Sequence, residues 1–85
     1  MNQTAQIKHA EKVMEDVRKK LASWNERSQF TMKGVKNLSR SDMDSITMYA
    51  EAIIRNGNYN CYMAPRGEVR DVLAAYGLAE KEVEY

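Results

Sequence analysis

The fold of this 85-residue chain is decided by residues 7–24, which read IKHAEKVMEDVRKKLASW. The apolar residues of this stretch recur in alternating steps of three and four positions: Ile7, Ala10, Met14, Val17, Leu21 and Trp24. This spacing keeps them on one face of an α-helix and predicts an amphipathic helix over residues 4–28. Such a helix would run roughly 37 Å, at about 1.5 Å per residue. Its apolar face must be covered by the rest of the chain or by another molecule.

A second helix is predicted over residues 40–56. Ser39 and Asp42 have the spacing of a capping box, although Ser41 offers a competing N-cap. The apolar face of this helix consists of Met43, Ile46, Ala50 and Ile53, widened by Thr47 and Ile54. Gly57, which follows an asparagine, tolerates the left-handed conformation that ends many helices.

A third, shorter helix is predicted over residues 65–76. Pro65 suits the first helical turn because its φ angle is already close to the helical value. The apolar face of this helix consists of Val69, Val72, Leu73 and Tyr76. Gly77 followed by Leu78 is typical of a helix end at which an apolar residue folds back over the last turn.

Strand signals are weaker than helix signals. Phe30 and Met32 alternate with polar neighbours and Gly34 breaks any helix, so we interpret residues 29–37 as a loop that could hold a very short strand. The same alternation occurs in the tyrosine- and asparagine-rich segment 58–64. Pairing between the two segments would give a minor two-strand element.

Together these signals predict a small all-α domain of three helices over residues 1–78. Residues 79–85 carry Glu80, Glu82 and Glu84 and are predicted to form an acidic flexible tail. Covering of the first helix by the two that follow predicts a monomer. A homodimer stays open as an alternative, but the heptad pattern is short and its flanking charges give no attractive pairs between two copies.

The composition is that of a globular protein, with 29% charged and 44% hydrophobic residues. The single cysteine, Cys61, excludes an internal disulfide and is typical of a reducing compartment. No apolar run approaches the roughly 18 residues of a membrane span, and the N-terminus lacks a signal pattern. We therefore expect a cytoplasmic protein that does not interact with membranes.

No catalytic constellation is visible in the sequence. One histidine, His9, and one cysteine, Cys61, are too few for a His/Cys zinc site within one chain. A nucleophilic pair would require these two residues to meet, and Cys61 is better explained as a small buried residue. Asp42 and Asp44 suit the start of a helix. We expect no enzymatic activity and no cofactor or metal.

Charge is divided unevenly along the chain. Residues 1–38 carry eight Lys or Arg against four Asp or Glu, whereas residues 39–85 carry five against eight. The two halves could complement each other within the fold, or the basic half could steer an acidic partner. The basic half includes Arg18, Lys19, Lys20, Arg27, Lys33 and Lys36.

Candidate partner-binding residues lie at the end of the first helix and in the tyrosine-rich connector. Trp24 is either a core residue at the helix end or an anchor for a partner. Tyr59 and Tyr62 either cover the core or offer contact area at low entropic cost. The predicted partner-binding set is Arg18, Lys20, Trp24, Arg27, Tyr59 and Tyr62.

These residues favour a protein-interaction module that binds a larger protein through a helix face. The alternative is a small DNA-binding transcriptional regulator that uses the basic face of the first helix to contact phosphates. A helix-turn-helix is disfavoured because the second and third helices are too far apart in sequence. Arg66 and Arg70 also share the third helix with Glu68 and Asp71, which would repel phosphate.

Residues 39–57 and the following segment NYNCYMAPRGEVRDVLAAYGL (58–78) give the chain a resemblance to a group of known proteins. In style and size it resembles the small helical proteins encoded by phages and prophage-like elements of Bacillus-type bacteria. The resemblance implies a non-enzymatic regulator of a host protein that acts in DNA replication, transcription or sporulation. It assigns no role to an individual residue.

Overall fold

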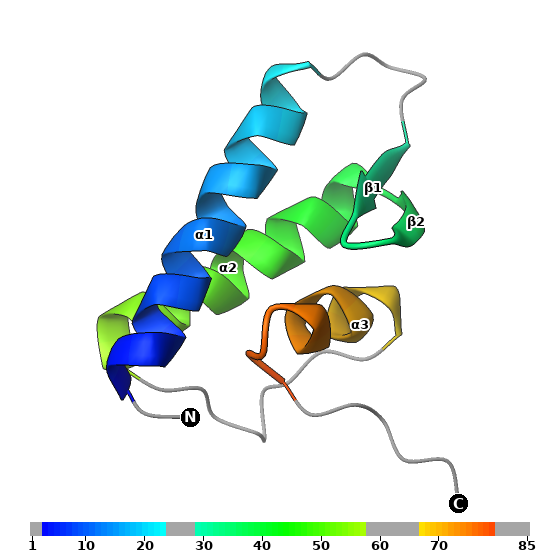
Figure 1. The fold of residues 1–85 in the computed structure, drawn as a ribbon. Coiled ribbons are helices and arrows are strands. Elements are labelled where there is room, and N and C mark those ends of the chain that lie inside the picture. Colours follow the sequence, from blue (N-terminus) through cyan, green and yellow to red (C-terminus); the bar gives the residue numbers. More distant parts are fainter. Residues whose placement is uncertain (1–2, 24–28, 58–66, 80–85) are drawn as a thin grey trace, which may run out of the picture.

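The computed structural model describes residues 3–23, 29–57 and 67–79, which form three helices and a small two-stranded sheet (Figure 1). The elements follow the order α1 (Gln3–Ala22), β1 (Phe30–Met32), β2 (Val35–Leu38), α2 (Arg40–Asn56) and α3 (Glu68–Ala75). The predicted all-α class and the minor two-strand element are confirmed. None of the described helices combines the length and apolar character that crossing a bilayer requires.

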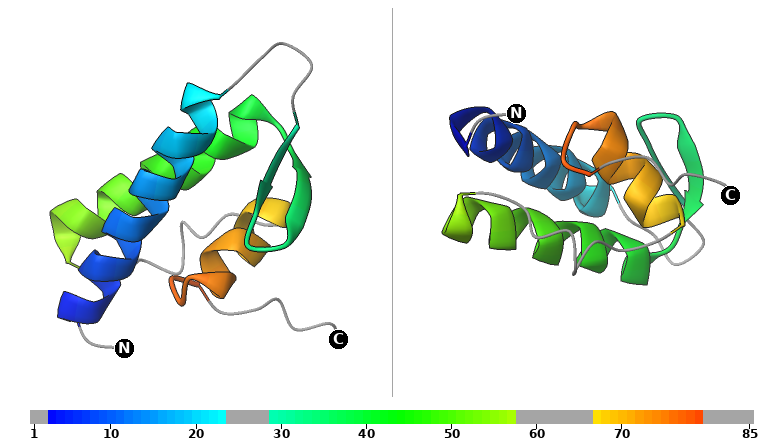
Figure 2. Two further views of the ribbon diagram at one scale, coloured as in Figure 1. Left: turned by 45° about the horizontal axis from the view of Figure 1, so that its top comes forward. Right: turned by 90° about the horizontal axis from the view of Figure 1, so that it is seen from below.

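Helix α2 is the main cover of α1. The two helices run in opposite directions and meet where α1 begins and α2 ends, and they diverge toward the hairpin (Figures 1 and 2). Helix α3 packs against α2 and β2 at this wider end. Val17 is only 3% exposed, and Met14 and Leu21 pack partly buried against the core. The apolar face of α1 is therefore covered within the chain, mainly by one following helix.

The buried face of α1 is rotated from the predicted one. Ile7, Met14 and Leu21 are only partly buried, whereas Val13, outside the predicted set, is fully buried. At 3.6 residues per turn the two faces differ by roughly 40°. The rotation arises because α1 is covered by α2 on one side and touched by the residue that follows α3 on the other. The buried residues of α1 are Gln6, Ala10, Val13 and Val17.

Helix α1 ends at Ala22, earlier than residue 28. The N–H and the hydroxyl of Ser23 both donate to the carbonyl of Lys20, over 3.2 and 3.0 Å. A serine that engages a terminal carbonyl in this way satisfies a group that a continuing helix would have used. Residues 24–28 lie outside the described residues.

The segment predicted to be a loop is a β-hairpin. Phe30 pairs with Leu38 and Met32 with Val35, in antiparallel register. The two residues between the strands, Lys33 and Gly34, have φ angles of 51° and 82°, as the common two-residue hairpin turn requires. The strand that pairs with β1 is thus the one directly after it. The expected pairing with residues 58–64 falls outside the described part of the chain.

The register contains a bulge on β2. Lys36 and Asn37 together oppose Thr31, because the pairing shifts by one residue between the two ends of β1. Asn37 has a φ angle of 64°, which asparagine tolerates better than most residues. A bulge of this kind increases the local twist of a hairpin.

Helix α2 has the predicted bounds. Ser39 Oγ accepts from the N–H of Asp42 over 3.1 Å, and Asp42 Oδ2 accepts from the N–H of Ser39 over 2.8 Å. These two hydrogen bonds form a capping box, and the N-cap is therefore Ser39 and not Ser41. The predicted core residues Met43, Ile46, Ala50 and Ile53 are at most 1% exposed. Ile54, expected to widen this face, is 37% exposed, and Tyr49 is buried instead.

Helix α3 begins at Glu68, later than the predicted Pro65. Gly67 has φ 72° and ψ −141°, which lie outside the helical range, so a helix cannot run through this position. The predicted apolar face of α3 is confirmed as buried. At its end, Leu78 is fully buried and its N–H donates to the carbonyl of Leu73 over 2.8 Å. This hydrogen bond is the one expected of a Schellman helix end.

The junction of α1 and α2 yields a testable prediction at Gly57. Its φ angle is 79°, and a Cβ atom there would overlap the side chain of Gln3. Gly34 has a similar φ of 82° but open space around it. We expect Gly34→Ala to lower the free energy of unfolding by about 1–2 kcal/mol through its backbone alone. Gly57→Ala should cost more, because Gln3 must also move.

Urea unfolding of the two variants, with and without Gln3→Ala, measures both contributions. Gln3→Ala should remove the excess cost of Gly57→Ala and leave Gly34→Ala unchanged. Equal costs for the two glycine variants would show that the exposed Gln3 side chain moves aside at no cost.

Candidate binding surface

A cavity lies between α1 and the hairpin, in the region where the two elements approach each other. Its volume is about 330 Å³. We call it the lysine pocket because three of its lining residues are lysines from two different elements. The lining residues are Asp16, Lys19, Lys20, Thr31, Met32, Lys33 and Tyr76.

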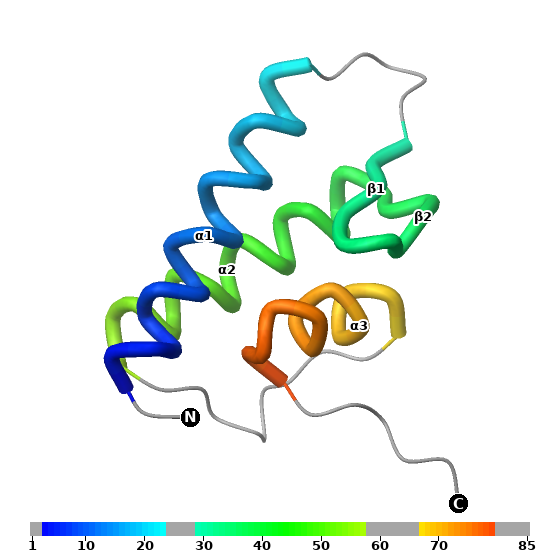
Figure 3. Tube along the Cα trace, in the orientation of Figure 1, coloured from blue at the N-terminus to red at the C-terminus, as the bar shows by residue number. Residues whose placement is uncertain are grey.

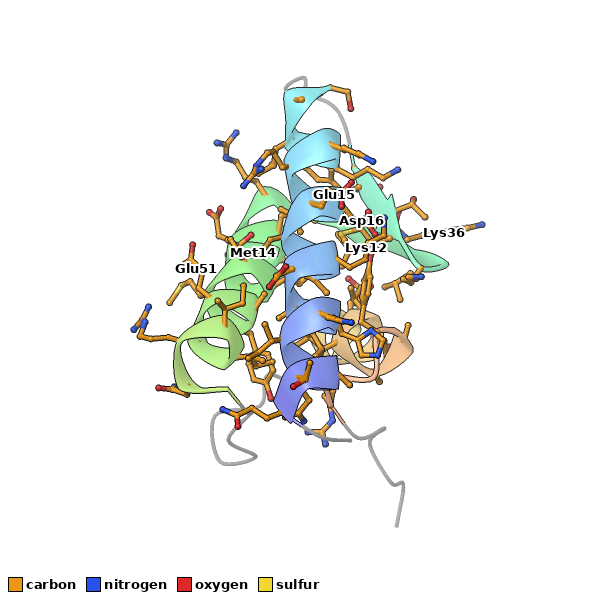
Figure 4. The ribbon with its side chains drawn as sticks, turned by 60° about the vertical axis from the view of Figure 1, so that its left-hand side comes forward. Lys12, Met14, Glu15, Asp16, Lys36 and Glu51 are labelled. Carbon is orange, nitrogen blue, oxygen red and sulfur yellow. The ribbon has the colours of Figure 1, made fainter. Side chains whose placement is uncertain are left out.

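The base of the pocket is a hydrogen-bonded contact between α1 and the end of α3. The hydroxyl of Tyr76 donates to Oδ2 of Asp16, and Lys12 Nζ lies 3.3 Å from Oδ1 of the same carboxylate. Figure 4 shows Lys12 and Asp16 on the same side of α1, the side toward the hairpin. Both carboxylate oxygens of Asp16 therefore have a partner.

This contact fixes the charge states of its members. Burial opposes ionisation of Asp16, but the hydrogen bond from Tyr76 and the nearby Lys12 outweigh it and lower the pKa of this carboxyl. Burial and the hydrogen bond to Asp16 raise the pKa of the Tyr76 hydroxyl above its ordinary value. At neutral pH the pair thus consists of an ionised carboxylate and a protonated phenol.

Lys33 lines the pocket from the hairpin. It occupies the hairpin turn, and its Nζ lies 4.7 Å from the centre of the Tyr76 ring. An ammonium group at this distance over an aromatic face is attracted by the ring quadrupole. A continuous series of contacts therefore runs from Lys12 through Asp16 and Tyr76 to Lys33, and it connects α1, the end of α3 and the hairpin.

The lysines around the pocket differ in how far their charge is compensated. Lys19 Nζ lies 3.1 Å from Oε1 of Glu15, and this ion pair lowers the pKa of the glutamate. Among the described residues, Lys20 and Lys33 have no ion-pair partner. Lys36 extends from the hairpin into solvent (Figure 4). The uncompensated positive charge of this surface is concentrated on Lys20 and the two hairpin lysines.

Only one of the predicted site residues lines the pocket. Lys20 does so, whereas Arg18 is exposed elsewhere on α1, since two residues correspond to a turn of about 200° around the helix. The predicted residues that lie outside the described part of the chain are Trp24, Arg27, Tyr59 and Tyr62.

Six of the seven pocket residues were not selected from the sequence, and Lys33 and Tyr76 are the most important of them. Lys33 was recognised only as part of the basic half, because nothing in its spacing relates it to Lys20. Tyr76 was assigned to the core of the third helix and is indeed 5% exposed. Its hydroxyl reaches a carboxylate 60 positions earlier in the chain, and helical periodicity carries no signal for such a contact.

The groups that line the pocket are cationic, hydroxylic and apolar, with the carboxylate of Asp16 at its base. Within residues 3–23, 29–57 and 67–79, no three His, Cys, Asp or Glu side chains gather in a way that could hold a metal ion. The pocket offers ammonium groups, a hydroxyl from Thr31 and a partly apolar floor. No family model, curated protein or solved structure matches the chain, so its function has to be inferred from this surface.

Proposed function

We propose that this chain is a non-enzymatic regulatory protein that binds a larger protein stoichiometrically through the surface around the lysine pocket. The observation that carries the proposal is that Lys20 of α1 and Lys33 of the hairpin turn line one cavity, without ion-pair partners among the described residues. Host regulators of replication, transcription or sporulation are the partners to examine first. We place the protein in the cytoplasm, on the basis of its single cysteine.

Packing of α1 supports recognition through charge rather than through its predicted apolar face. Ala10 and Val17 of this face are buried, and Met14 and Leu21 pack partly buried against the core, so little of its described part is left for a partner or a second copy. This arrangement supports a monomer that presents a preformed basic surface. Charged groups on such a surface increase the association rate with a partner of opposite charge.

The carboxylates on α1 disfavour DNA as the principal partner. Asp16 lines the pocket, and Glu15 pairs with Lys19, which also lines it. Lys12 and Lys19 are already paired with these two residues. Phosphate contacts require cations free of such neighbours, because the release of counterions from the nucleic acid drives the binding. We therefore favour a protein partner, and the experiment below distinguishes it from DNA.

Affinity capture from a bacterial lysate, with and without nuclease, tests the proposal. The test variant is Lys20→Glu with Lys33→Glu, which reverses the two pocket charges that have no ion-pair partner in the described part of the chain. The matched control is Lys8→Glu with Arg55→Glu, which changes net charge equally at exposed positions outside the pocket lining. We expect the wild type and the control to retain a protein in near-stoichiometric amount after nuclease treatment, and the pocket variant to lose it.

Circular dichroism of each variant verifies that helical content is unchanged. Recovery of nucleic acid alone would contradict the proposal. Equal capture by the wild type and the pocket variant would also contradict it, because the partner would then bind elsewhere.

A further inference from the structure

We infer that the lysine pocket recognises a carboxylate side chain in an acidic segment of the protein partner. The ammonium groups of Lys20 and Lys33 would hold the carboxylate, and the aliphatic part of the same segment would rest on Met32 and the Tyr76 ring. This inference rests on the proposed function and adds the chemistry of the group that is recognised.

The size of the cavity suits one or two side chains. Its volume of about 330 Å³ lies at the small end of ligand-binding clefts, which span about 300–1,000 Å³. A helix or a nucleic acid duplex needs a long groove instead. An extended segment that inserts a single acidic side chain matches the available space.

One of the two lysines proposed to hold the ligand is positioned before any ligand arrives. Lys33 is positioned by the Tyr76 ring, 4.7 Å away, and the ring is positioned by the hydrogen bond to Asp16. Lys12 completes the series by pairing with the same carboxylate. Because Lys33 is already positioned, its ordering costs less conformational entropy on binding.

The negative charge of Asp16 is compensated inside the protein, so the pocket keeps a net positive character. Its two oxygens are engaged by Tyr76 and Lys12, and neither faces the ligand without a partner. The pocket therefore presents two cations, Lys20 and Lys33, next to the Asp16 carboxylate, whose charge is already balanced by Lys12. A single carboxylate balances this arrangement better than a polyanion, which would meet Asp16 and Glu15 as well.

One further feature favours a carboxylate on an aliphatic stem over a phosphate. The pocket lining includes Met32 and Tyr76, whose small remaining exposed surface adds apolar contact for the methylene groups of a glutamate.

The inference can be tested with three synthetic probes and the intact chain. The first is a capped hexapeptide of alternating glutamate and leucine, and the second replaces each glutamate by glutamine. The third is a single-stranded oligothymidylate with the same negative charge as the first. Binding is followed by amide chemical-shift changes in two-dimensional NMR spectra.

We expect the glutamate peptide to shift the amides of Lys20, Thr31 and Lys33 in a saturable way. The glutamine peptide should not produce these shifts. Lys20→Gln with Lys33→Gln should weaken binding of the glutamate peptide about tenfold, since each exposed charge pair contributes up to about 1 kcal/mol. The control Lys8→Gln with Arg55→Gln should bind as the wild type does.

Three results would overturn the inference: no shifts with the glutamate peptide at millimolar concentration, equal shifts with the glutamine peptide, or tighter binding of the oligothymidylate. Its failure is distinguishable from failure of the proposed function. If lysate capture depends on Lys20 and Lys33 while the glutamate peptide does not bind, only the carboxylate chemistry is wrong. If the peptide binds but no protein is captured, the carboxylate-binding pocket is supported and the proposed regulatory role is wrong.

Discussion

Ile46→Ala is expected to lower the free energy of unfolding by about 2–5 kcal/mol, the range found when a buried isoleucine is truncated. Ile46 is fully buried and belongs to the hydrophobic core cluster, to which α1, the hairpin, α2 and α3 all contribute. A chain of 85 residues has a total stability of roughly 4–13 kcal/mol. The loss is therefore a large share of the total, and at the upper end of its range it would leave much of the protein unfolded.

Ile54→Ala is the matched control for this prediction. The same atoms are removed from the same helix, but Ile54 is 37% exposed. We expect a change of no more than about 0.5 kcal/mol, partly because alanine is the better helix former. Urea unfolding followed by circular dichroism measures both values. Similar losses at the two positions would show that α2 presents a different face to the core.

Tyr76→Phe is expected to lower the free energy of unfolding by about 1–2 kcal/mol at neutral pH. The variant keeps the ring, and with it the contact to Lys33, but removes the hydroxyl that donates to Asp16. Hydrogen bonds to charged groups contribute about 1.5–3 kcal/mol. We reduce this range because the Asp16 side chain is 25% exposed and solvent screens its charge.

The cost of Tyr76→Phe should depend on pH in both directions. The folded-state pKa of Asp16 is lowered from 3.8, so its stabilising effect is present above that value and is lost as the pH falls through the folded-state pKa. The folded-state pKa of Tyr76 is raised from 10.0, so its contribution is present below pH 10 and is lost as the pH rises further. The difference between wild type and variant should thus be largest between about pH 4 and pH 10.

Urea unfolding at a series of pH values checks this profile, and Asp16→Asn provides the control. In the Asp16→Asn background, Tyr76→Phe should cost less and should lose its dependence on acid pH, because the two residues act as one unit. A constant difference between wild type and Tyr76→Phe across the pH range would show that the hydroxyl contributes only through packing.

Local signals predicted α2 more completely than any other element. Its start depends on Ser39 and Asp42, three positions apart, and its end on Gly57, so the information lies within the helix and its immediate neighbours. The capping groups bond to one another in the structure as their spacing predicts. Where the determinants of an element are close in sequence, the pattern alone was sufficient.

The hairpin and the rotation of α1 depend on information of a different kind. Lys33 has a positive φ angle, which its residue type does not predict. The sequence therefore indicated only a helix break at Gly34 and not a two-residue turn formed by Lys33 and Gly34. The face of α1 was predicted from periodicity, which gives the spacing of buried residues but not their centre when two elements cover the helix. Val13 was missed for this reason.

The candidate site was predicted only in part, because it is assembled from distant segments. The basic character of α1 and the segment after it was evident, and Lys20, which was predicted to bind a partner, lines the pocket. The hydrogen bond between Tyr76 and Asp16 could not be predicted from the residues that flank either of them in the sequence. It arises from the placement of α3 against α2 and β2, which is a property of the tertiary structure.

The position of Tyr76 in the chain has a consequence for synthesis on the ribosome. Figure 3 follows the path from α1 through the hairpin and α2 to α3, and the base of the lysine pocket comes from the residue directly after α3. A nascent chain can bring α1, the hairpin and α2 together before this residue emerges, since folding proceeds as segments leave the ribosome. The pocket is nevertheless incomplete until translation has passed residue 76, so shorter translation products lack the floor on which Lys33 is held.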